Sequence, residues 1–349
     1  MAGLVAAALL FAGCTSQTET EMERFSGSFY DTFDTVVQLV AFAEDQEAFD
    51  EYMEALKTRF TALHKEFDNY NAYDGVNNIY TVNEKAGQEP VQVNEPIIEL
   101  LEQTRERYDT LSEKTDISNG ALYAVWHDHR EMETPTVPEQ TDLEAAAAHS
   151  GMEHIIIDRE AGTVMIDDPK VQIDLGAVAK GYATEVAAKE LEAMGLTSGI
   201  INSGGNVRTI GKPLDGREHW GIGIQNPDYL LGESSEENAE VLYVSDQSVV
   251  TSGDYQRFFT VDEEVYHHLI DPDTLFPATH MRAVSVVTQD SGLADFLSTA
   301  VFLMPYEEGR ALIDSVEGAE ALWITKEGDL LYTEGMKQIA YSQGAGATE

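Results

Sequence analysis

The segment that most constrains this chain is 292–304 (Gly-Leu-Ala-Asp-Phe-Leu-Ser-Thr-Ala-Val-Phe-Leu-Met), which predicts a mostly apolar, buried helix. It carries one acid, Asp295, and four residues later one hydroxyl, Thr299. Residues at this spacing lie one turn apart on the same helical face. A buried carboxylate is costly unless positive charge compensates it. We therefore expect a Lys or Arg partner, a helix-cap role or a metal ion at Asp295, and the segment alone favours the first two.

The charge balance limits the possible partners. The 349 residues allow one large or two ordinary domains, and they contain 63 acidic against 21 basic residues, a formal net charge of −42. Phosphate backbones need a basic surface, so nucleic acid is not an expected partner. The acidity fits a protein exposed to salt or to the cell exterior, and it equally fits a merely soluble acidic surface.

The N-terminus predicts export and lipidation. Residues 1–14 form an apolar run that ends in small residues and Cys14, the single cysteine. This run is too short to span a bilayer, and it resembles the lipobox of bacterial lipoproteins. We expect a signal peptide over 1–14 with a lipid on Cys14, a tether over 15–28, a domain over 29–340 and a flexible tail over 341–349. The protein would then be lipid-anchored at the cell membrane on its extracytoplasmic side, periplasmic or outer face.

The order of predicted elements indicates an α+β fold. Apolar spacings of three and four predict helices over 46–67 and 94–111. Runs rich in β-branched and aromatic residues predict strands, among them 33–42, 171–175, 200–207, 220–225 and 282–288. Strands and helices do not alternate as regular parallel βαβ units, so we expect mixed or antiparallel sheets flanked by helices.

Three shorter stretches carry side chains of interest. Tyr70 and Tyr73 stand in a polar loop, where packing is favoured over stacking on a planar ligand. His127 and His129 alternate, as on one face of a strand, and surface histidines are the default interpretation. The turn 176–181 before a predicted helix contains Lys180; glycine, a helix start and a cation together suit an anion.

Four blocks of residues, in this order, resemble the ApbE family of FAD:protein FMN transferases. They are 174–183 (Asp-Leu-Gly-Ala-Val-Ala-Lys-Gly-Tyr-Ala), 202–206 (Asn-Ser-Gly-Gly-Asn), 251–255 together with 268–274, and Ala294-Asp295 followed by Thr299. Residues 116–120 with Trp126, and the Asn69-Tyr70 loop, also match. The resemblance runs from about Phe29 to Lys337.

The resemblance implies a two-lobed fold with the active site in the cleft between the lobes. It implies a Mg²⁺-dependent enzyme that transfers FMN from FAD to a Thr or Ser hydroxyl of an acceptor protein, through a phosphoester bond, and releases AMP. Similar members are often lipoproteins, and their acceptors include subunits of membrane redox complexes.

The resemblance also implies particular site residues. Asp295, Thr299 and the carbonyl of Ala177 would bind the metal. The FAD site would be lined by Phe33, Tyr70, Lys114, Thr115, Asp116, Asp174, Lys180, His268 and Ile270. The catalytic candidates are His268, Lys180 and Asp271. With these blocks beside it, the metal interpretation of Asp295 becomes the favoured one.

The chemistry of the candidates is consistent with pyrophosphate cleavage. Magnesium prefers oxygen ligands and keeps several waters, so a sparse site suits it. His268 could accept the proton of the acceptor hydroxyl or merely orient phosphate, and the sequence leaves both roles open. Two rival functions also remain: a Mg²⁺-dependent FAD pyrophosphatase and a non-catalytic FAD-binding lipoprotein.

Departures from the family pattern occur at two turns. Leu275 stands where a glycine is usual, and Phe33-Asp34-Thr35 stands where many members carry Met-Gly-Thr. The tail ends in Gly-Ala-Thr before Glu349, a fragment of the family's acceptor motif, with Ala345 where that motif has Ser or Thr.

Overall fold

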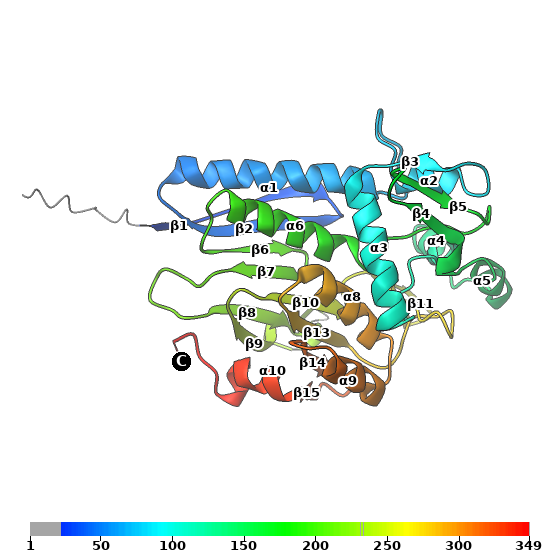
Figure 1. Cartoon of the computed structure of the whole chain (residues 1–349). Coiled ribbons are helices and arrows are strands. Elements are labelled where there is room, and N and C mark those ends of the chain that lie inside the picture. Colours follow the sequence, from blue (N-terminus) through cyan, green and yellow to red (C-terminus); the bar gives the residue numbers. More distant parts are fainter. Residues whose placement is uncertain (1–21, 231, 233, 349) are drawn as a thin grey trace, which may run out of the picture.

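The computed structural model describes residues 22–230, 232 and 234–348. Its centre is an eight-stranded sheet in which every neighbouring pair is antiparallel (Figure 1). In spatial order the strands are β1 (Glu23–Thr32), β2 (Thr35–Ala43), β6 (Gly199–Ser203), β7 (Asn206–Ile210), β10 (Ser248–Gly253), β13 (Ala283–Thr288), β14 (Glu320–Ile324) and β15 (Leu330–Tyr332). This confirms the α+β class with antiparallel sheets.

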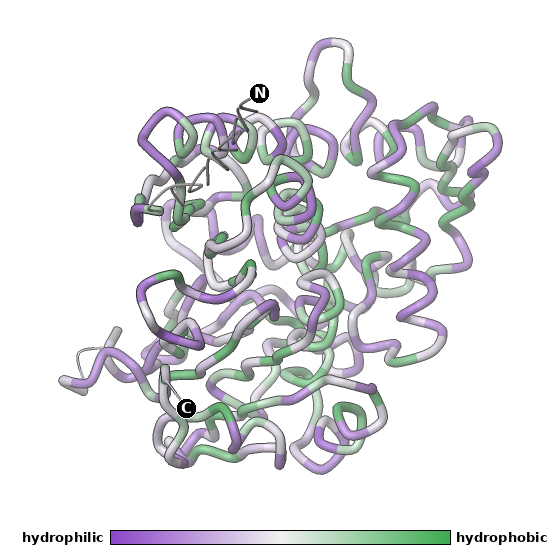
Figure 2. The backbone as a smooth tube through the Cα atoms, turned by 60° about the vertical axis from the view of Figure 1, so that its left-hand side comes forward, coloured by the Kyte–Doolittle hydropathy of each residue, from purple (hydrophilic) through white to green (hydrophobic). Residues whose placement is uncertain are grey.

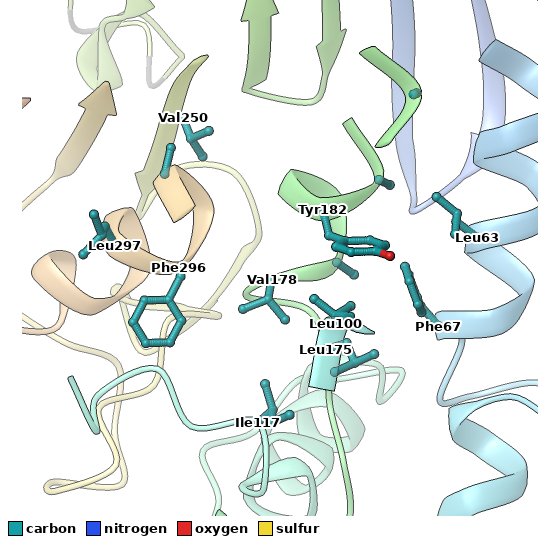
Figure 3. Packing of buried hydrophobic residues seen from close by; sticks show 14 of the residues in the cluster. Leu63, Phe67, Leu100, Ile117, Leu175, Val178, Tyr182, Val250, Phe296 and Leu297 are labelled. Atoms are coloured by element: carbon teal, nitrogen blue, oxygen red, sulfur yellow. The ribbon is translucent and has the colours of Figure 1, made fainter. Parts of the chain in front are cut away.

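Helices cover one face of this sheet. They are α1 (Gln46–Phe67), α6 (Ala179–Ala193), α8 (Ser291–Phe302) and α9 (Tyr306–Ser315), with α3 (Glu95–Thr110) packed against α1. Helix α8 lies against β10 and β13, and all its residues from Ala294 to Phe302 are buried. The predicted buried, apolar helix is therefore confirmed. Figure 3 shows Phe296 and Leu297 of α8 in the same core as Tyr182 of α6.

A smaller layer covers part of the other face. It consists of the antiparallel pair β8 (Trp220–Gln225) and β9 (Asn238–Val244), with α10 (Glu334–Ile339) and η2 (Tyr341–Gln343) beside β9. Ile222 and Ile224 of β8 share a core with Val207, Val249 and Val287 of the large sheet. Both faces of the central strands are therefore buried, as the alternation of side chains along a strand allows.

Most of the remaining elements form a third region beside one end of the sheet (Figure 1). A three-stranded sheet has the order β3 (Val91–Gln92), β5 (Thr163–Ile166), β4 (Ile155–Asp158). Around it lie α2 (Ile79–Glu84), α4 (Gly120–Arg130), α5 (Gln140–Ala147) and η1 (Met152–His154). Two further elements are the short helix α7 (Pro227–Leu230), which follows β8, and the hairpin of β11 (Phe258–Val261) with β12 (Glu264–His267). Trp126 of α4 packs with Leu122, Leu143 and Ile270, which ties this region to the chain after β12.

Several local predictions were wrong. The tether predicted through residue 28 instead enters the sheet, because Glu23 to Phe29 pair with β2. His127 and His129 lie on helix α4, not on a strand. The segment 171–175 forms only an isolated bridge at Gln172.

The tail is not free along its length. Ser342 donates to Glu240, and the carbonyl of Ala347 accepts from the N–H groups of Glu218 and His219 (3.1 Å from the latter). Figure 2 shows hydrophilic and hydrophobic residues alternating along most of the described chain. Among the described residues no helix is long and apolar enough to span a bilayer. The predicted signal peptide and Cys14 lie outside the described residues.

Candidate active site

Helices α6 and α8 cross where the site forms. The N–H of Gly181, in the first turn of α6, donates a 2.7 Å hydrogen bond to Oδ2 of Asp295 on α8. A Cβ atom at Gly181 would lie 2.4 Å from Cβ of Asp295 and 2.4 Å from the carbonyl oxygen of Ser291. The absence of a side chain at Gly181 is therefore what allows the two helices to approach closely enough for this contact.

Asp295 is a buried carboxylate without an ion-pair partner among the described residues. Asp295 and Thr299 are 4% and 7% exposed. Burial raises the pKa of Asp295, and the positive charge of Lys180 opposes the rise. Arg107, whose charge also acts on this carboxylate, forms its ion pair with Asp290, at 3.2 Å. The ion-pair interpretation of this helix therefore loses its direct support, and the site keeps an anionic group that a cation would stabilise.

The donor set at this crossing fits magnesium. Asp295, Thr299 and Ala177 line one cavity and offer a carboxylate, a hydroxyl and a backbone carbonyl, all oxygen donors. Nowhere in residues 22–230, 232 and 234–348 do three or more His, Cys, Asp or Glu side chains gather to hold a metal ion. The local chemistry thus suits a hard cation that keeps part of its water shell.

One cavity, of about 1120 Å³, brings the predicted residues together. It lies between the end of the large sheet with its helices and the region of α4, β11 and β12. Every residue predicted to bind the cofactor or the metal lines it: Phe33, Tyr70, Lys114, Thr115, Asp116, Asp174, Ala177, Lys180, His268, Ile270, Asp295 and Thr299. A cavity of this size accommodates a large organic ligand such as a dinucleotide.

Asp271 is the exception. It is absent from the cavity wall, is 5% exposed, and accepts a 2.7 Å hydrogen bond from Nζ of Lys114 through Oδ1. The same ammonium group donates to Asp273, also at 2.7 Å. The structure therefore places Asp271 behind Lys114, where it orients that side chain and does not face the cavity.

The acids on the wall are held by local hydrogen bonds. Asp116 accepts from the N–H and the hydroxyl of Ser118 (2.8 and 2.6 Å), and burial raises its pKa. Asp174 accepts from Gly176 N–H (2.8 Å) and from the amide of Asn69 (3.0 Å). These contacts fix the carboxylates at the cavity surface, and the Asn69 bond joins the tyrosine loop to the turn before α6.

The two loop tyrosines have different environments. Tyr73 donates to Asp68 at 2.7 Å and packs against His64, as predicted for both. Tyr70 instead is 52% exposed and lines the cavity, with its ring centroid 4.9 Å from that of His127. Tyr70 therefore packs against His127, and its exposed ring surface also leaves room to stack on a planar ligand in the cavity.

His268 is held as a neutral base. Its Nδ1–H donates to the carbonyl of Arg257 at 3.3 Å, so Nδ1 carries the single proton of the neutral ring. The lone pair of Nε2 is then free to accept a proton. Burial lowers the pKa of His268, and the charges of Arg257 and Lys180 act in the same direction. The adjacent His267 uses both ring nitrogens, donating to Ala278 and accepting from Leu269, so its role is structural.

The two turns that depart from the family pattern keep a left-handed backbone. Leu275 has a φ of 66°, and its conformation is held by an N–H bond to Asp271 and by the indole of Trp126, which donates to its carbonyl at 2.9 Å. Phe33 and Asp34 have φ angles of 52° and 51°. Glycine favours such angles, so these turns carry side chains at some cost in strain.

Sequence reasoning missed several residues of the wall. Arg257 lines the cavity and its carbonyl orients His268; it lies two residues after the block 251–255 that carries part of the resemblance. His127 and Arg130 line the cavity from α4, and their spacing of three was the signal of a helical face.

Solved ApbE proteins share this α+β fold. A crystal structure of the ApbE protein of Thermotoga maritima superposes with a TM-score of 0.81 at 26% identity, covering 91% of this chain and 99% of that one. The flavin transferase ApbE of Vibrio cholerae gives a TM-score of 0.74 at 22% identity, over 91% and 99% of the two chains.

Sequence comparison gives the same family. The ApbE family profile matches residues 33–323. A FAD:protein FMN transferase of Klebsiella pneumoniae (strain 342) is 29% identical over 80% of this chain and 84% of its own length, and one of Treponema pallidum (strain Nichols) is 32% identical over 77% and 76%. The chain belongs to the ApbE family.

Proposed function

We propose that this protein is a FAD:protein FMN transferase, a transferase that moves FMN from FAD to a hydroxyl of an acceptor protein. The observation that carries the proposal is the single cavity in which an aromatic ring (Tyr70), a cation (Lys180), a neutral imidazole (His268) and a buried carboxylate (Asp295) meet. Relatives that cover most of the chain carry this name.

Transfer needs an acceptor hydroxyl to lose its proton as it attacks phosphorus. The new bond joins the acceptor oxygen to the FMN phosphorus; the pyrophosphate P–O bond breaks, and AMP leaves with the bridging oxygen. His268 takes the acceptor's proton at Nε2, since Nδ1–H is held by Arg257. Lys180 stabilises charge on the phosphate oxygens from the first turn of α6, where the positive end of the helix dipole adds to the attraction.

Magnesium would be held by Asp295, Thr299 and the Ala177 carbonyl, and it would neutralise charge on the pyrophosphate. Gly181 fixes one oxygen of Asp295 by its hydrogen bond. Lys114, oriented by Asp271, places its ammonium group on the cavity wall as a hydrogen-bond donor. In this proposal Asp271 is a positioning residue and not a catalytic one.

The cellular setting is also a proposal. A lipid on Cys14 would anchor the protein at the extracytoplasmic face of the membrane, next to acceptors that are subunits of membrane redox complexes. The acidic composition suits such exposure. Metabolic labelling with a radioactive fatty acid should mark the wild type and not the Cys14→Ala variant.

Incubation with FAD, Mg²⁺ and a candidate acceptor tests the function. The transferase produces a fluorescent flavoprotein that survives denaturing electrophoresis, with one AMP released per flavin bound. Free FMN and AMP without a flavinylated acceptor would identify the pyrophosphatase instead. Recovery of intact FAD after prolonged incubation would favour a non-catalytic binding protein.

A further inference from the structure

The cavity extends well beyond the residues proposed to bind FAD. Its charged wall carries Lys114, Asp116, Asp174 and Lys180. A second part, which we call the trough, has its floor on the large sheet and one wall on β8 (222–225). The trough residues Gln38, Asn202, Val207, Ile222, Gly223 and Gln225 are all uncharged, in a chain with a net charge of −42. Such a surface offers little to a pyrophosphate.

The floor of the trough crosses four adjacent strands. Gln38 of β2 opposes Asn202 of β6, which opposes Val207 of β7, which opposes Val249 of β10. Directly opposed residues share one face of a sheet, and all four line the cavity. Val207 and Val249 are buried with the side chains of β8, whereas Gln38 is exposed. The face is therefore covered at β7 and β10 and open at β2 and β6.

The wall of the trough is the edge of a strand. Four consecutive residues of β8, from Ile222 to Gln225, line the cavity. Side chains alternate between faces, so a consecutive run can line a cavity only through the strand's edge. Within the described part of the chain β8 pairs with β9 alone, which leaves the N–H and C=O groups of its other edge for another strand.

Two glycines line this part of the cavity, and the side chain of Asn238 on β9 lies against Gly223. Gly223 of β8 is exposed, and Gly205, with a φ of +95°, lines the same cavity at the turn between β6 and β7. Glycine in such positions often marks the close approach of another backbone.

The trough is continuous with the reaction site. Thr251 and Ser252 of β10 line the same cavity as the trough residues, and so do Asp295 and Thr299 of α8. The trough and the proposed metal site are therefore two parts of one cavity.

We propose that the trough binds the acceptor protein as an extended segment that adds to the free edge of β8 and delivers its Thr or Ser hydroxyl to His268. The inference rests on the proposed function, which requires a polypeptide to reach this cavity. Main-chain hydrogen bonds to β8 supply affinity independent of sequence, and the uncharged floor selects neutral, small side chains around the hydroxyl.

A bulky substitution in the trough tests the proposal. The probe is a synthetic peptide with Ser-Gly-Ala-Thr at its centre. Gln38→Trp should reduce flavin transfer to this peptide at least tenfold, while FAD affinity and the slow release of AMP in the absence of peptide stay within twofold of wild type. Ile156→Trp is the matched control, because Ile156 is 46% exposed on β4 and outside the cavity wall. Unchanged transfer in Gln38→Trp, or loss of FAD binding, would overturn the proposal.

Hydrogen exchange on the wild-type protein provides a test that needs no variant. The same peptide with Val in place of Thr, added with saturating FAD, should slow exchange of backbone amides within 220–225. If the Thr peptide is flavinylated but the Val peptide does not slow exchange within 220–225, binding in the trough is refuted and the proposed function is not. Failure of the wild type to release AMP from FAD with Mg²⁺ instead overturns the proposed function.

Discussion

The N–H of Gly181 donates to Oδ2 of Asp295 across the α6–α8 crossing, and this contact joins the two halves of the site. On one side it fixes the carboxylate proposed to hold magnesium. On the other it sets the start of α6, and hence the place of Lys180 on the cavity wall. Anything that separates these helices should disturb both functions together.

Gly181→Ala tests that coupling. The new methyl group would lie 2.4 Å from both Cβ of Asp295 and the carbonyl oxygen of Ser291, so one helix must shift. We expect a loss of about 1–3 kcal/mol in the free energy of unfolding, as for other overpacked sites, and strongly reduced Mg²⁺-dependent turnover. Gly292→Ala is the control, because its nearest atoms, on flexible side chains, lie at 3.3 Å. Equal unfolding curves for the two variants would contradict the account.

Asp295→Asn should separate stability from metal binding. Burial raises the pKa of Asp295, so ionisation of this group opposes folding at neutral pH, and the neutral amide should be at least as stable without metal. Wild type should gain about 2.7 kcal/mol when Mg²⁺ is present at a hundred times its Kd, and the variant should gain nothing. Thermal unfolding with and without Mg²⁺ measures both effects, and a Mg²⁺-induced shift in the variant would remove Asp295 from the site.

The pH dependence of kcat/KM reports the pKa values of the essential acid and base in the free enzyme, and it therefore reports the pKa of His268 if this residue is the base. Because burial and neighbouring positive charges lower the pKa of His268, its imidazole should stay neutral to well below the ordinary histidine value of 6.5. The acid limb of the profile should lie below pH 6, provided the acceptor does not titrate there. Arg257→Gln removes one of those charges, so it should move this limb upward. A limb above 6.5 in wild type, or a downward move in the variant, would exclude His268 as the base.

Lys114 should matter for stability as well as for binding. Lys114→Met leaves Asp271, 5% exposed, without its cation, and we expect a cost of roughly 2 kcal/mol in the free energy of unfolding. Adding Asp271→Asn should recover part of this loss, because the buried charge is then gone. Lys85→Met removes the exposed pair with Glu89 and should leave chemical denaturation nearly unchanged. An equal loss in the free energy of unfolding for Lys114→Met and Lys85→Met would contradict a larger contribution from the buried Lys114–Asp271 pair.

Much of the site could be predicted from sequence because its residues sit in short, chemically distinctive blocks. Asp295 and Thr299 were visible as polar residues four apart in an apolar helix, and Lys180 as a cation in a glycine turn. The requirement for glycine at position 181 could not be predicted from sequence, because it depends on how closely α6 approaches α8. Asp271 was predicted as catalytic although it lies behind Lys114, because neighbours in sequence need not share a surface.

Other misses have equally local causes. Residues 23–28 form the first part of β1, although their polar composition favoured a tether, because pairing with β2 supplies the order that their own sequence does not. His127 and His129 alternate in sequence but lie on α4, where Trp126 packs into a core and sets the helix orientation. The trough could not be predicted from sequence, because its floor depends on which residues of neighbouring strands lie opposite one another. No single segment encodes this strand register.

The most direct test of the central claim is the product balance of one reaction. Purified protein, FAD, Mg²⁺ and an acceptor peptide with a single Thr are incubated, and AMP is quantified together with the flavin-modified peptide by mass spectrometry. We expect equal amounts of AMP and FMN–peptide in wild type, and neither product in Asp295→Asn. AMP without modified peptide, or full transfer in Asp295→Asn, would contradict this expectation.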